Sequence, residues 1–364
     1  MSTLGIYIHV PFCAKKCPYC DFYSEKFTGT ASSSYVDAVI RNIGYYADND
    51  TCIDTVYFGG GTPSLLNAKQ LGDILGCIGD SFRLDNNAEI TLEANPCTLT
   101  EKKLSELHDT GINRLSIGVQ SMVDDELKLL GRLHDSARAE KAVLDAYSAG
   151  FENISCDLMT ALPHQTCESL EYSINKLAAL PVTHISAYIL KAENDTPFDC
   201  DEIRDSLPDD DSTANLYMQT VSLLEKHGFA QYEISNFAKK GYESRHNCKY
   251  WRCEDYIGIG PSAHSCFNGK RFAVKNDLDA FIRSDVQPTF ITDDSPCGFE
   301  EFVMLMLRLT EGYDINTFPE HRGELEKKIP GLLKAGYVKF ENDRISLTPK
   351  GFLVSNQVIG YLVF

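Results

Sequence analysis

The chain has 364 residues, of which 43% are hydrophobic, 24% charged and 10% aromatic, and this composition excludes a disordered or fibrous protein. At about 150 residues per domain, the length predicts two or three domains. The formal net charge of −18 argues against a nucleic-acid-binding protein, which needs a basic surface to displace phosphate counterions. It argues equally against docking on anionic lipid.

The apolar runs of the sequence are all much shorter than the roughly 18 residues of a membrane span, so we expect no stable membrane insertion. Strand-like sequence begins at Leu4, so we expect no signal peptide and a cytoplasmic protein. The 13 cysteines would then not form a disulfide framework. We expect some of them to be metal ligands and the rest to be small buried hydrophobic residues.

The first half of the chain alternates between two kinds of segment. Short runs rich in β-branched or aromatic residues predict strands at Leu4–Val10, Thr55–Phe58, Glu89–Ala94, Arg114–Val119, Ile154–Met159 and Thr183–Leu190. Helical spacing predicts helices at Ser32–Tyr46, Asn67–Phe82, Thr100–Asp109, Asp124–Gly131, Ala137–Ala149 and Cys167–Ala179. This order favours consecutive βα units around a parallel sheet, whose chemistry lies at the carboxyl ends of the strands.

The second half has a different organisation. An acidic stretch at 199–211 reads as an exposed connection before a helix at Thr213–His227, and residues 229–290 are less regular. The C-terminal segment predicts a helix at Phe299–Leu309, a helix at Leu325–Ala335 with a break at Pro330, strands at Tyr337–Glu341 and Arg344–Thr348, and a last helix from Pro349. We therefore expect units at 1–200, 201–290 and 291–364, the last a small winged-helix-like α+β module. Residues 299–364 hold eight Lys or Arg against nine Asp or Glu, so a nucleic-acid role for this module is disfavoured.

The most specific motif is a cysteine triplet, Cys13, Cys17 and Cys20, directly after the first predicted strand. Three thiolates within eight residues can surround one soft metal centre. Pro18 lies inside the triplet and favours a loop over a regular helix. A zinc site or an all-cysteine iron–sulfur cluster would need a fourth ligand. A [4Fe–4S] cluster with three protein ligands would keep one iron open for a substrate.

Polar residues and glycines follow several of the other predicted strands. The run Gly59–Pro63 follows the second strand, Glu93 and Gln120 end the third and fourth, and Asp157 lies in the fifth. Glycines let a backbone approach a ligand closely. Each of these residues alone could be an ordinary turn or a buried polar group. Their repeated position at strand ends predicts a common site.

A Cys-x3-Cys-x2-Cys loop after the first strand of a βα repeat resembles that of the radical S-adenosylmethionine (SAM) superfamily. The flanking residues 6–12 and Asp21-Phe22 are similar to those of the coproporphyrinogen III dehydrogenase (HemN) group, most of all its HemW-type haem-chaperone branch. The resemblance implies a partial (βα)6 barrel that carries a [4Fe–4S] cluster on Cys13, Cys17 and Cys20. It also implies that the open iron binds S-adenosylmethionine.

The resemblance also implies roles for individual residues of this chain. It implies that Tyr7, Gly60 and Glu93 contact the cluster-bound S-adenosylmethionine. The positions that match contacts to a second S-adenosylmethionine are Tyr19, Gly61, Thr62, Gln120, Arg132 and Asp157. The run 245–251 resembles the HNxxYW motif of the haem-chaperone branch, which makes His246 a candidate haem-associated residue. The stretch Gly258–Ser265 resembles a segment that closes over S-adenosylmethionine, with His264 as its contact.

Two departures bear on function. Catalytic coproporphyrinogen dehydrogenases carry a further cysteine two residues after the last cluster ligand, where this chain has Phe22, and they carry an N-terminal extension that this chain lacks. We therefore expect a haem chaperone that delivers haem to an acceptor haemoprotein, with an electron donor such as flavodoxin or ferredoxin. The alternative is an oxygen-independent coproporphyrinogen III dehydrogenase or another radical enzyme.

Overall fold

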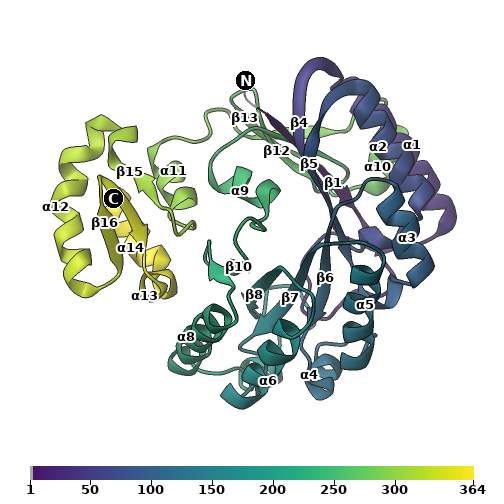
Figure 1. Ribbon diagram of the computed structural model, residues 1–364. Helices are drawn as coiled ribbons and strands as arrows, with labels where there is room; N and C mark the ends of the chain where they lie inside the picture. Colours follow the sequence, from purple (N-terminus) through teal and green to yellow (C-terminus); the bar gives the residue numbers. More distant parts are fainter. Residues whose placement is uncertain (1–2) are drawn as a thin grey trace.

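The computed structural model describes residues 3–364 and contains a barrel-like α/β domain with a smaller α+β module beside it (Figure 1). Six consecutive parallel strands form the curved sheet of the barrel. They are β1 (Leu4–Val10), β4 (Asp48–Gly60), β5 (Phe82–Ala94), β6 (Arg114–Gln120), β7 (Asn153–Thr160) and β8 (His184–Ile189). Hydrogen bonding runs in that order with no pairing between β1 and β8, so the predicted open, partial (βα)6 barrel is confirmed.

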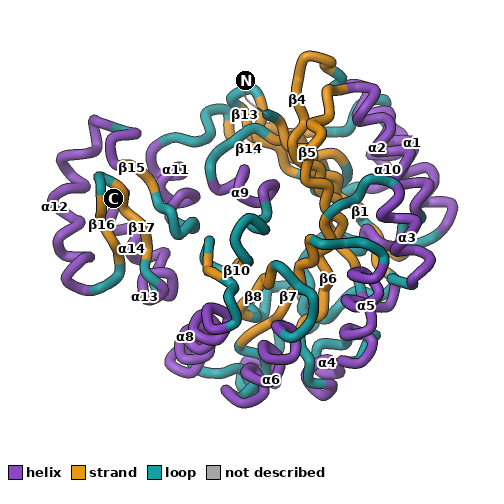
Figure 2. The backbone as a smooth tube through the Cα atoms, viewed as in Figure 1, coloured by secondary structure: helices purple, strands orange, loops and turns teal. Residues whose placement is uncertain are grey.

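Helices connect the strands and cover the outer face of the sheet (Figure 2). They are α1 (Gly29–Tyr45), α2 (Ala68–Ser81), α3 (Glu101–Asp109), α4 (Asp124–Leu129), α5 (Ser136–Ser148) and α6 (Cys167–Ala178). Polar side chains cap several of their N-termini. The Thr100 hydroxyl accepts from Lys103 N at the start of α3, and the Thr166 hydroxyl caps α6. Each of these helices therefore begins within a few residues of its predicted start.

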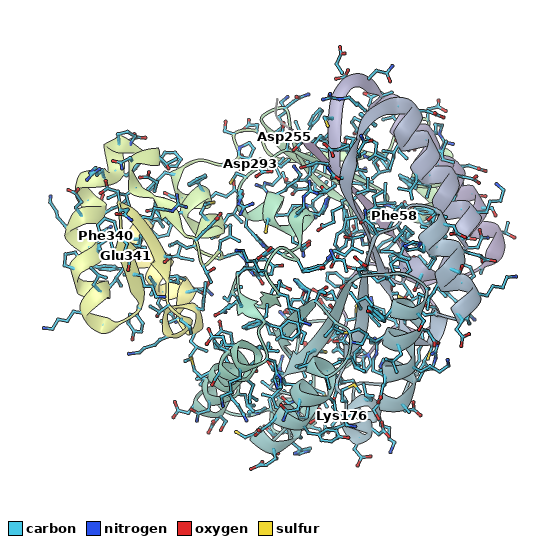
Figure 3. The ribbon with its side chains drawn as sticks, viewed as in Figure 1. Phe58, Lys176, Asp255, Asp293, Phe340 and Glu341 are labelled. Atoms are coloured by element: carbon cyan, nitrogen blue, oxygen red, sulfur yellow. The ribbon has the colours of Figure 1, made fainter. Side chains whose placement is uncertain are left out.

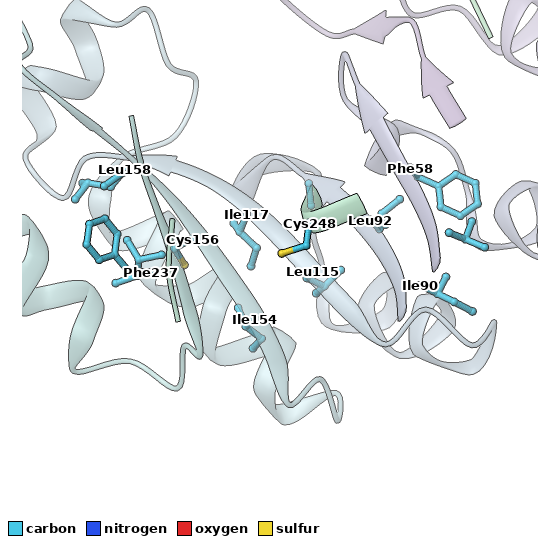
Figure 4. Close-up of a cluster of buried hydrophobic side chains, with 14 of the residues drawn as sticks. Phe58, Ile90, Leu92, Leu115, Ile117, Ile154, Cys156, Leu158, Phe237 and Cys248 are labelled. Carbon is cyan, nitrogen blue, oxygen red and sulfur yellow. The ribbon is translucent and has the colours of Figure 1, made fainter. Parts of the chain in front are cut away.

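The strands alternate between an apolar outer face and a polar inner face. Outward side chains of β5–β7, among them Leu92, Ile117 and Leu158, are fully buried against the helices (Figure 4). Inward positions of the same strands hold Glu93 and Arg114. This period of two places the hydrophobic core between sheet and helices. It leaves the barrel interior for charged and hydroxyl groups, which must find partners there.

Residues 229–290 extend the sheet at both edges, which the irregular sequence pattern did not predict. Beyond β8 lie two short antiparallel strands, and beyond β1 lies β11, parallel to β1, followed by antiparallel β12–β14. The bounds are β9 (Ala230–Gln231), β10 (Asn236–Ala238), β11 (Tyr256–Ile259), β12 (His264–Phe267), β13 (Lys270–Val274) and β14 (Thr289–Asp293). Helices in this region and before it are α7 (Asp201–Arg204), α8 (Asp210–Lys226), α9 (Arg245–Trp251) and α10 (Leu278–Arg283).

The C-terminal module packs helices on a three-stranded antiparallel sheet of order β15-β17-β16. Its elements are α11 (Phe299–Met306), β15 (Tyr313–Asp314), α12 (Pro319–Ala335), β16 (Val338–Glu341), β17 (Arg344–Leu347), α13 (Pro349–Leu353) and α14 (Ser355–Val363). The expected break at Pro330 is wrong, because α12 begins at Pro319 and runs through it. Burial of Ile329 and Leu332 holds the helix together across the proline.

Short elements complete the described chain. Strands β2 (Phe12–Cys13) and β3 (Glu25–Lys26) form a separate parallel pair, and three 3-10 turns lie at Pro63–Leu65, Pro96–Thr98 and Ile315–Thr317. Within residues 3–364, none of the helices is both long and apolar enough to cross a membrane.

Candidate functional site

A cavity of about 440 Å³ lies at the carboxyl ends of the barrel strands. Eleven of the fourteen predicted site residues line it: Cys13, Cys17, Tyr19, Cys20, Gly60, Gly61, Thr62, Glu93, Gln120, Arg132 and Asp157. They come from the cysteine loop, the ends of β4–β7 and the segment after α4. The structure therefore brings together residues that are spread over 145 positions of sequence, from Cys13 to Asp157.

Backbone hydrogen bonds hold the cysteine loop at both of its ends. Glu25 N donates to Pro11 O at 2.6 Å and Phe27 N donates to Cys13 O at 3.2 Å. Between these anchors, Cys20 N donates to Cys17 O at 3.1 Å and closes a turn around Pro18. The turn keeps the three thiols on the wall of the cavity, where each is partly exposed.

Two hydrogen-bond donors reach the cysteine sulfurs. Arg132 Nη1 lies 3.4 Å from Cys17 Sγ, and the Thr62 hydroxyl lies 3.7 Å from Cys13 Sγ. Such donors stabilise negative sulfur and tune the potential of an iron–sulfur cluster. Burial raises the pKa of Cys20, and the neighbouring thiols Cys17 and Cys13 raise it further. A metal centre that neutralises the thiolates would relieve this repulsion.

The donor set fits a cluster better than a single ion. Across residues 3–364, no three His, Cys, Asp or Glu side chains converge closely enough to ligate one metal ion. The cysteines that line the cavity are the triplet alone. A four-iron cluster separates its thiolates more widely than one ion does, and three thiolates leave its fourth iron open. The residues present therefore fit a three-cysteine [4Fe–4S] cluster.

Glycines allow the β4 end to pass close to the cysteine loop. A Cβ on Gly61 would lie 2.5 Å from Phe12 O, and Gly60 has φ of 107°. The backbone at Gly61 continues the pairing, because Gly61 N donates to Val10 O and Thr62 N donates to Phe12 O. A side chain at Gly61 would push the strand away from the loop and open the cavity wall.

Two half-buried carboxyl groups line the same cavity as the thiols. Glu93 accepts hydrogen bonds from the Tyr57 hydroxyl at 2.8 Å and from Gly60 N at 3.1 Å, and Asp157 accepts from the Ser116 hydroxyl at 3.2 Å. Burial, and secondly the charge of Asp157, raise the pKa of Glu93 to about 7. Burial also raises the pKa of Asp157 to about 6. A cationic ligand in this cavity would be stabilised by both groups in their ionised form.

Arg132 and Gln120 join the end of β6 to the cysteine loop. Arg132 Nη2 donates to Gly118 O at 2.6 Å, while Nη1 lies 3.4 Å from both Cys17 Sγ and the Tyr19 hydroxyl. Gln120 has φ of 73°, a left-handed conformation that is uncommon for a residue with a side chain. Strained backbone of this kind clusters at ligand-binding positions, and the Gln120 amide and the Arg132 guanidinium both lie beside Gly118.

Three predicted site residues do not line the cavity. Tyr7 lies deeper in the barrel, with its hydroxyl 3.1 Å from His9 Nδ1. His264 is exposed at the start of β12. His246 is fully buried on α9, with Nδ1 2.8 Å from the Thr55 hydroxyl and Nε2 2.8 Å from the Tyr250 hydroxyl. Burial, then the charges of Lys249 and Arg114, lower the pKa of His246 to about 3, so its ring is neutral.

Helix α9 lies within the opening of the barrel, between β10 and the strands β12 and β13 (Figure 1). The Glu89 carboxylate, near the start of the inward face of β5, accepts from Arg245 N and His246 N at 3.0 Å each. Lys249 Nζ lies 2.9 Å from Asp54 on β4. These contacts explain why the polar run 245–251 is internal: its partners are the polar residues on the inner face of the sheet.

Sequence reasoning missed several cavity residues. They are Lys15, Asp21, Phe22, Pro63, Ala94, Asn95, Ser116, Gly118, Met159, Tyr188, Ile189, Leu190, Lys191 and Glu193. The alternation of inward positions along β5–β8 was a signal for Ser116, Tyr188 and Met159. No pattern in the sequence signals the side-chain directions of the connecting segment 190–193.

Comparisons with known proteins place this geometry in a class. Residues 7–177 match the model of the Radical SAM superfamily, and residues 299–354 match that of the HemN C-terminal domain. The fold is that of Escherichia coli coproporphyrinogen III oxidase (HemN), described as a radical SAM enzyme, with a TM-score of 0.84 at 23% identity over 99% of this chain and 90% of that one. The open barrel with its cysteine loop is therefore a radical SAM fold of the HemN type.

Curated relatives narrow the class. The chain is 36% identical to the heme chaperone HemW of Bacillus subtilis over 97% of both chains, and 33% identical to that of Lactococcus lactis over 97% of this chain and 95% of the other. It is 39% identical to the Escherichia coli protein of the same name over 72% of this chain and 70% of the other. The chain belongs to the HemW family.

Proposed function

We propose that this chain is a haem chaperone that holds a [4Fe–4S] cluster on Cys13, Cys17 and Cys20, binds S-adenosylmethionine beside it, and passes haem to an acceptor haemoprotein. The observation that carries the proposal is one cavity that is lined both by the three thiols and by the half-buried carboxyl groups of Glu93 and Asp157. The names of the full-length relatives support the haem cargo.

The residues of the cavity have separate tasks in this proposal. When bound, the cluster supplies an open iron and a source of one electron next to the sulfonium ligand. Arg132 and Thr62 donate hydrogen bonds to cysteine sulfurs and so hold the negative charge of the thiolates. Glu93, fixed by Tyr57 and Gly60 N, offers an acceptor to the amino group of the ligand.

We do not favour decarboxylation of coproporphyrinogen. Phe22 lines the cavity and is 61% exposed, so an apolar ring stands where the catalytic relatives of this fold have a further cysteine. A flat exposed ring is suited to stack on a planar porphyrin. An electron donor such as flavodoxin or ferredoxin and a cytoplasmic location belong to the proposal as expectations.

A haem role for His246 stays a prediction and carries a structural condition. Both ring nitrogens are engaged and the side chain is fully buried, so α9 would have to leave the barrel before the imidazole met haem iron. Replacing Tyr250 with Phe frees Nε2 without removing the ring. If His246 ligates haem, Tyr250→Phe should tighten binding and His246→Ala should abolish the ligand signature.

The test is a haem titration of anaerobically reconstituted protein, followed by Soret absorbance. We expect saturable binding of one haem per chain and haem transfer to an apo-haemoprotein, with transfer lost in Cys13→Ser/Cys17→Ser/Cys20→Ser protein. The matched control is Cys97→Ser, which removes an exposed thiol outside the triplet. An intact cluster without saturable haem binding, together with 5′-deoxyadenosine formation that rises with porphyrinogen, would favour the dehydrogenase instead.

A further inference from the structure

A second group of thiols lies at the junction between the extended sheet and the C-terminal module, outside the cavity. Cys253 lies in the loop between α9 and β11, Cys266 lies on β12, and Cys297 directly precedes Gly298 and α11. Cys266 is paired across the sheet with Tyr256, three residues after Cys253, and with Arg271. The Arg271 guanidinium lies 2.9 Å from the Glu301 carboxylate, which accepts from Cys297 N. The three cysteines, which span positions 253 to 297 of the sequence, thus lie in one region, and the Cys253 and Cys266 thiols both affect the pKa of the Cys297 thiol.

The backbone directs two of these thiols. Cys253 has φ of 55° and Cys297 has φ of 67°, both in the left-handed region that side chains rarely adopt. The Cys297 turn is held by the Glu301 carboxylate, which accepts from Cys297 N at 2.6 Å. Such conformations persist only where surrounding contacts impose them, so the placement of these cysteines is a built feature.

A positive charge lies beside the thiols. Arg271 on β13 is the residue opposite Cys266 on β12, and its Nη2 lies 2.9 Å from Glu301. The buried Nε of Arg271 has no hydrogen-bond partner within residues 3–364. The Cys297 thiol and the Arg271 charge favour a thiolate at Cys253, whose pKa is lowered mainly by its hydrogen bond with Cys297. A thiolate with a neighbouring thiol is the arrangement that disulfide exchange requires.

The three cysteines differ in their exposure to solvent. Cys253 and Cys297 are partly exposed, whereas Cys266 is buried at 4% exposure. The hydrogen bond with Cys297, together with burial, raises the pKa of Cys266. Cys266 therefore packs as a hydrophobic residue under the pair, and Cys253 and Cys297 are the two that solvent and small oxidants reach.

We propose that Cys253 and Cys297 are a redox-sensitive pair that closes into a disulfide, with a small disulfide such as oxidised glutathione as the oxidant. The Cys253 thiolate attacks one sulfur of the oxidant, forms a mixed disulfide and releases one glutathione thiolate. Cys297 then loses its proton and attacks Cys253 Sγ, which expels the second glutathione. Two protein thiols are oxidised by two electrons, and one small disulfide is reduced to two thiols.

The bond would tie the chain segment that enters α11 to the loop that leaves α9. Figure 3 labels Asp255 and Asp293, which lie near these two segments between the barrel and the C-terminal module. Because α9 also fills the barrel, oxidation would restrict movement of the module relative to α9. The site thus makes the domain junction sensitive to the thiol–disulfide balance of its surroundings.

The experiment treats reconstituted full-length protein anaerobically with oxidised glutathione and maps the cysteines by alkylation and mass spectrometry. Digestion with trypsin and Glu-C cuts after Arg252 and Glu254, so Cys253 and Cys266 fall in different peptides. We expect the peptides of Cys253 and Cys297 to be linked within one chain. Cys253 should become protected about tenfold faster than the exposed Cys97 and Cys167.

Cysteine-to-serine variants distinguish formation of the mixed disulfide from closure of the disulfide within the protein. Cys297→Ser should leave Cys253 as a mixed disulfide with glutathione, and Cys266→Ser should still form the linked pair. Alkylation of Cys253 at the same rate as Cys97 would overturn the proposal, as would a link from Cys297 to Cys266 or between two chains. Circular dichroism of each variant checks that the readout concerns folded protein.

Discussion

At the scale of single residues, Glu93 is the carboxyl group of the cavity with the most strongly raised pKa. Burial raises the pKa of its carboxyl group and that of the nearby Asp157, and the charge of Asp157 raises the pKa of Glu93 further. Both carboxyl groups have lower pKa values in the unfolded chain. Between the ordinary pKa and the raised one, the folded protein binds more protons than the unfolded chain. The free energy of unfolding of the empty protein therefore falls as the pH rises through this window.

We predict that Glu93→Gln removes much of this dependence. Wild-type protein without ligands should lose about 1–3 kcal/mol of unfolding free energy between pH 5 and pH 8 through Glu93, and the neutral amide should not. Urea unfolding at several pH values measures the difference. The control is Glu106→Gln on the exposed face of α3, which should follow wild type. A constant gap between Glu93→Gln and wild type over this range would contradict the assignment.

Sequence reasoning reached the residues of the cavity by two routes, their position at strand ends and the resemblance to the HemN group. Position at strand ends predicted that Glu93, Gln120 and Asp157 share a site, because carboxyl ends of parallel strands meet at one edge of a sheet. It could not show that His246 is buried with both nitrogens engaged. The two partners of the imidazole are Thr55, which is far from His246 in sequence, and Tyr250, which is one helical turn away on a segment without hydrophobic periodicity.

At the scale of secondary-structure elements, α9 depends on one side chain of β5. Glu89 accepts two backbone N–H groups at the start of the helix, and its charge is close to the fully buried guanidinium of Arg114. The barrel strands were predictable from alternation and β-branched residues. Helix α9 was not predictable, since a run as polar as Arg-His-Asn carries no sign of burial.

We predict that Glu89→Ala destabilises the protein by about 2–4 kcal/mol, because it leaves two amide groups and a buried cation without their partner. Glu89→Gln should cost less, since its amide oxygen still accepts at the helix start. Denaturant unfolding measures both. Equal costs for the two variants would show that the capping bonds contribute little beyond the charge.

Helix α12 contains a proline, Pro330, in its interior, where proline is unfavourable. Pro330 lacks the N–H that Glu326 O would accept, and its ring crowds the preceding turn. We predict that Pro330→Ala raises the stability of the C-terminal module by about 1–3 kcal/mol, measured by thermal unfolding. The neighbouring Gly331→Ala, whose Cβ would meet open space, should add about 1 kcal/mol. Destabilisation by Pro330→Ala would mean that the proline ring contributes to the packing of the module.

At the scale of the whole molecule, α9 connects the barrel to the C-terminal module. The Arg308 guanidinium lies 4.3 Å from the ring centre of Trp251, and Arg252 pairs with Glu311 at 2.8 Å. The same helix places His246 against the Thr55 hydroxyl of β4. The run 245–251, which resembles the HNxxYW motif, therefore contacts both the barrel and the C-terminal module. We call these contacts the joint between the two domains.

We predict that Trp251→Ala loosens this joint while the barrel stays folded. Loss of the cation–π contact should weaken the interface by about 1–2 kcal/mol, which makes proteolysis of the linking segment 294–298 about tenfold faster. Limited proteolysis with mass spectrometry measures the rate. Trp251→Phe keeps an aromatic ring and should behave more like wild type, and an unchanged cleavage rate in Trp251→Ala would assign the joint to other contacts.

The position of α9 also decides how the barrel is filled and emptied. Its contacts with Asp54 and Glu89 keep it inside the barrel, whereas the cysteine loop lies at the carboxyl ends of the strands. We therefore expect a ligand to approach the Glu93 side chain from the side of the cysteine loop.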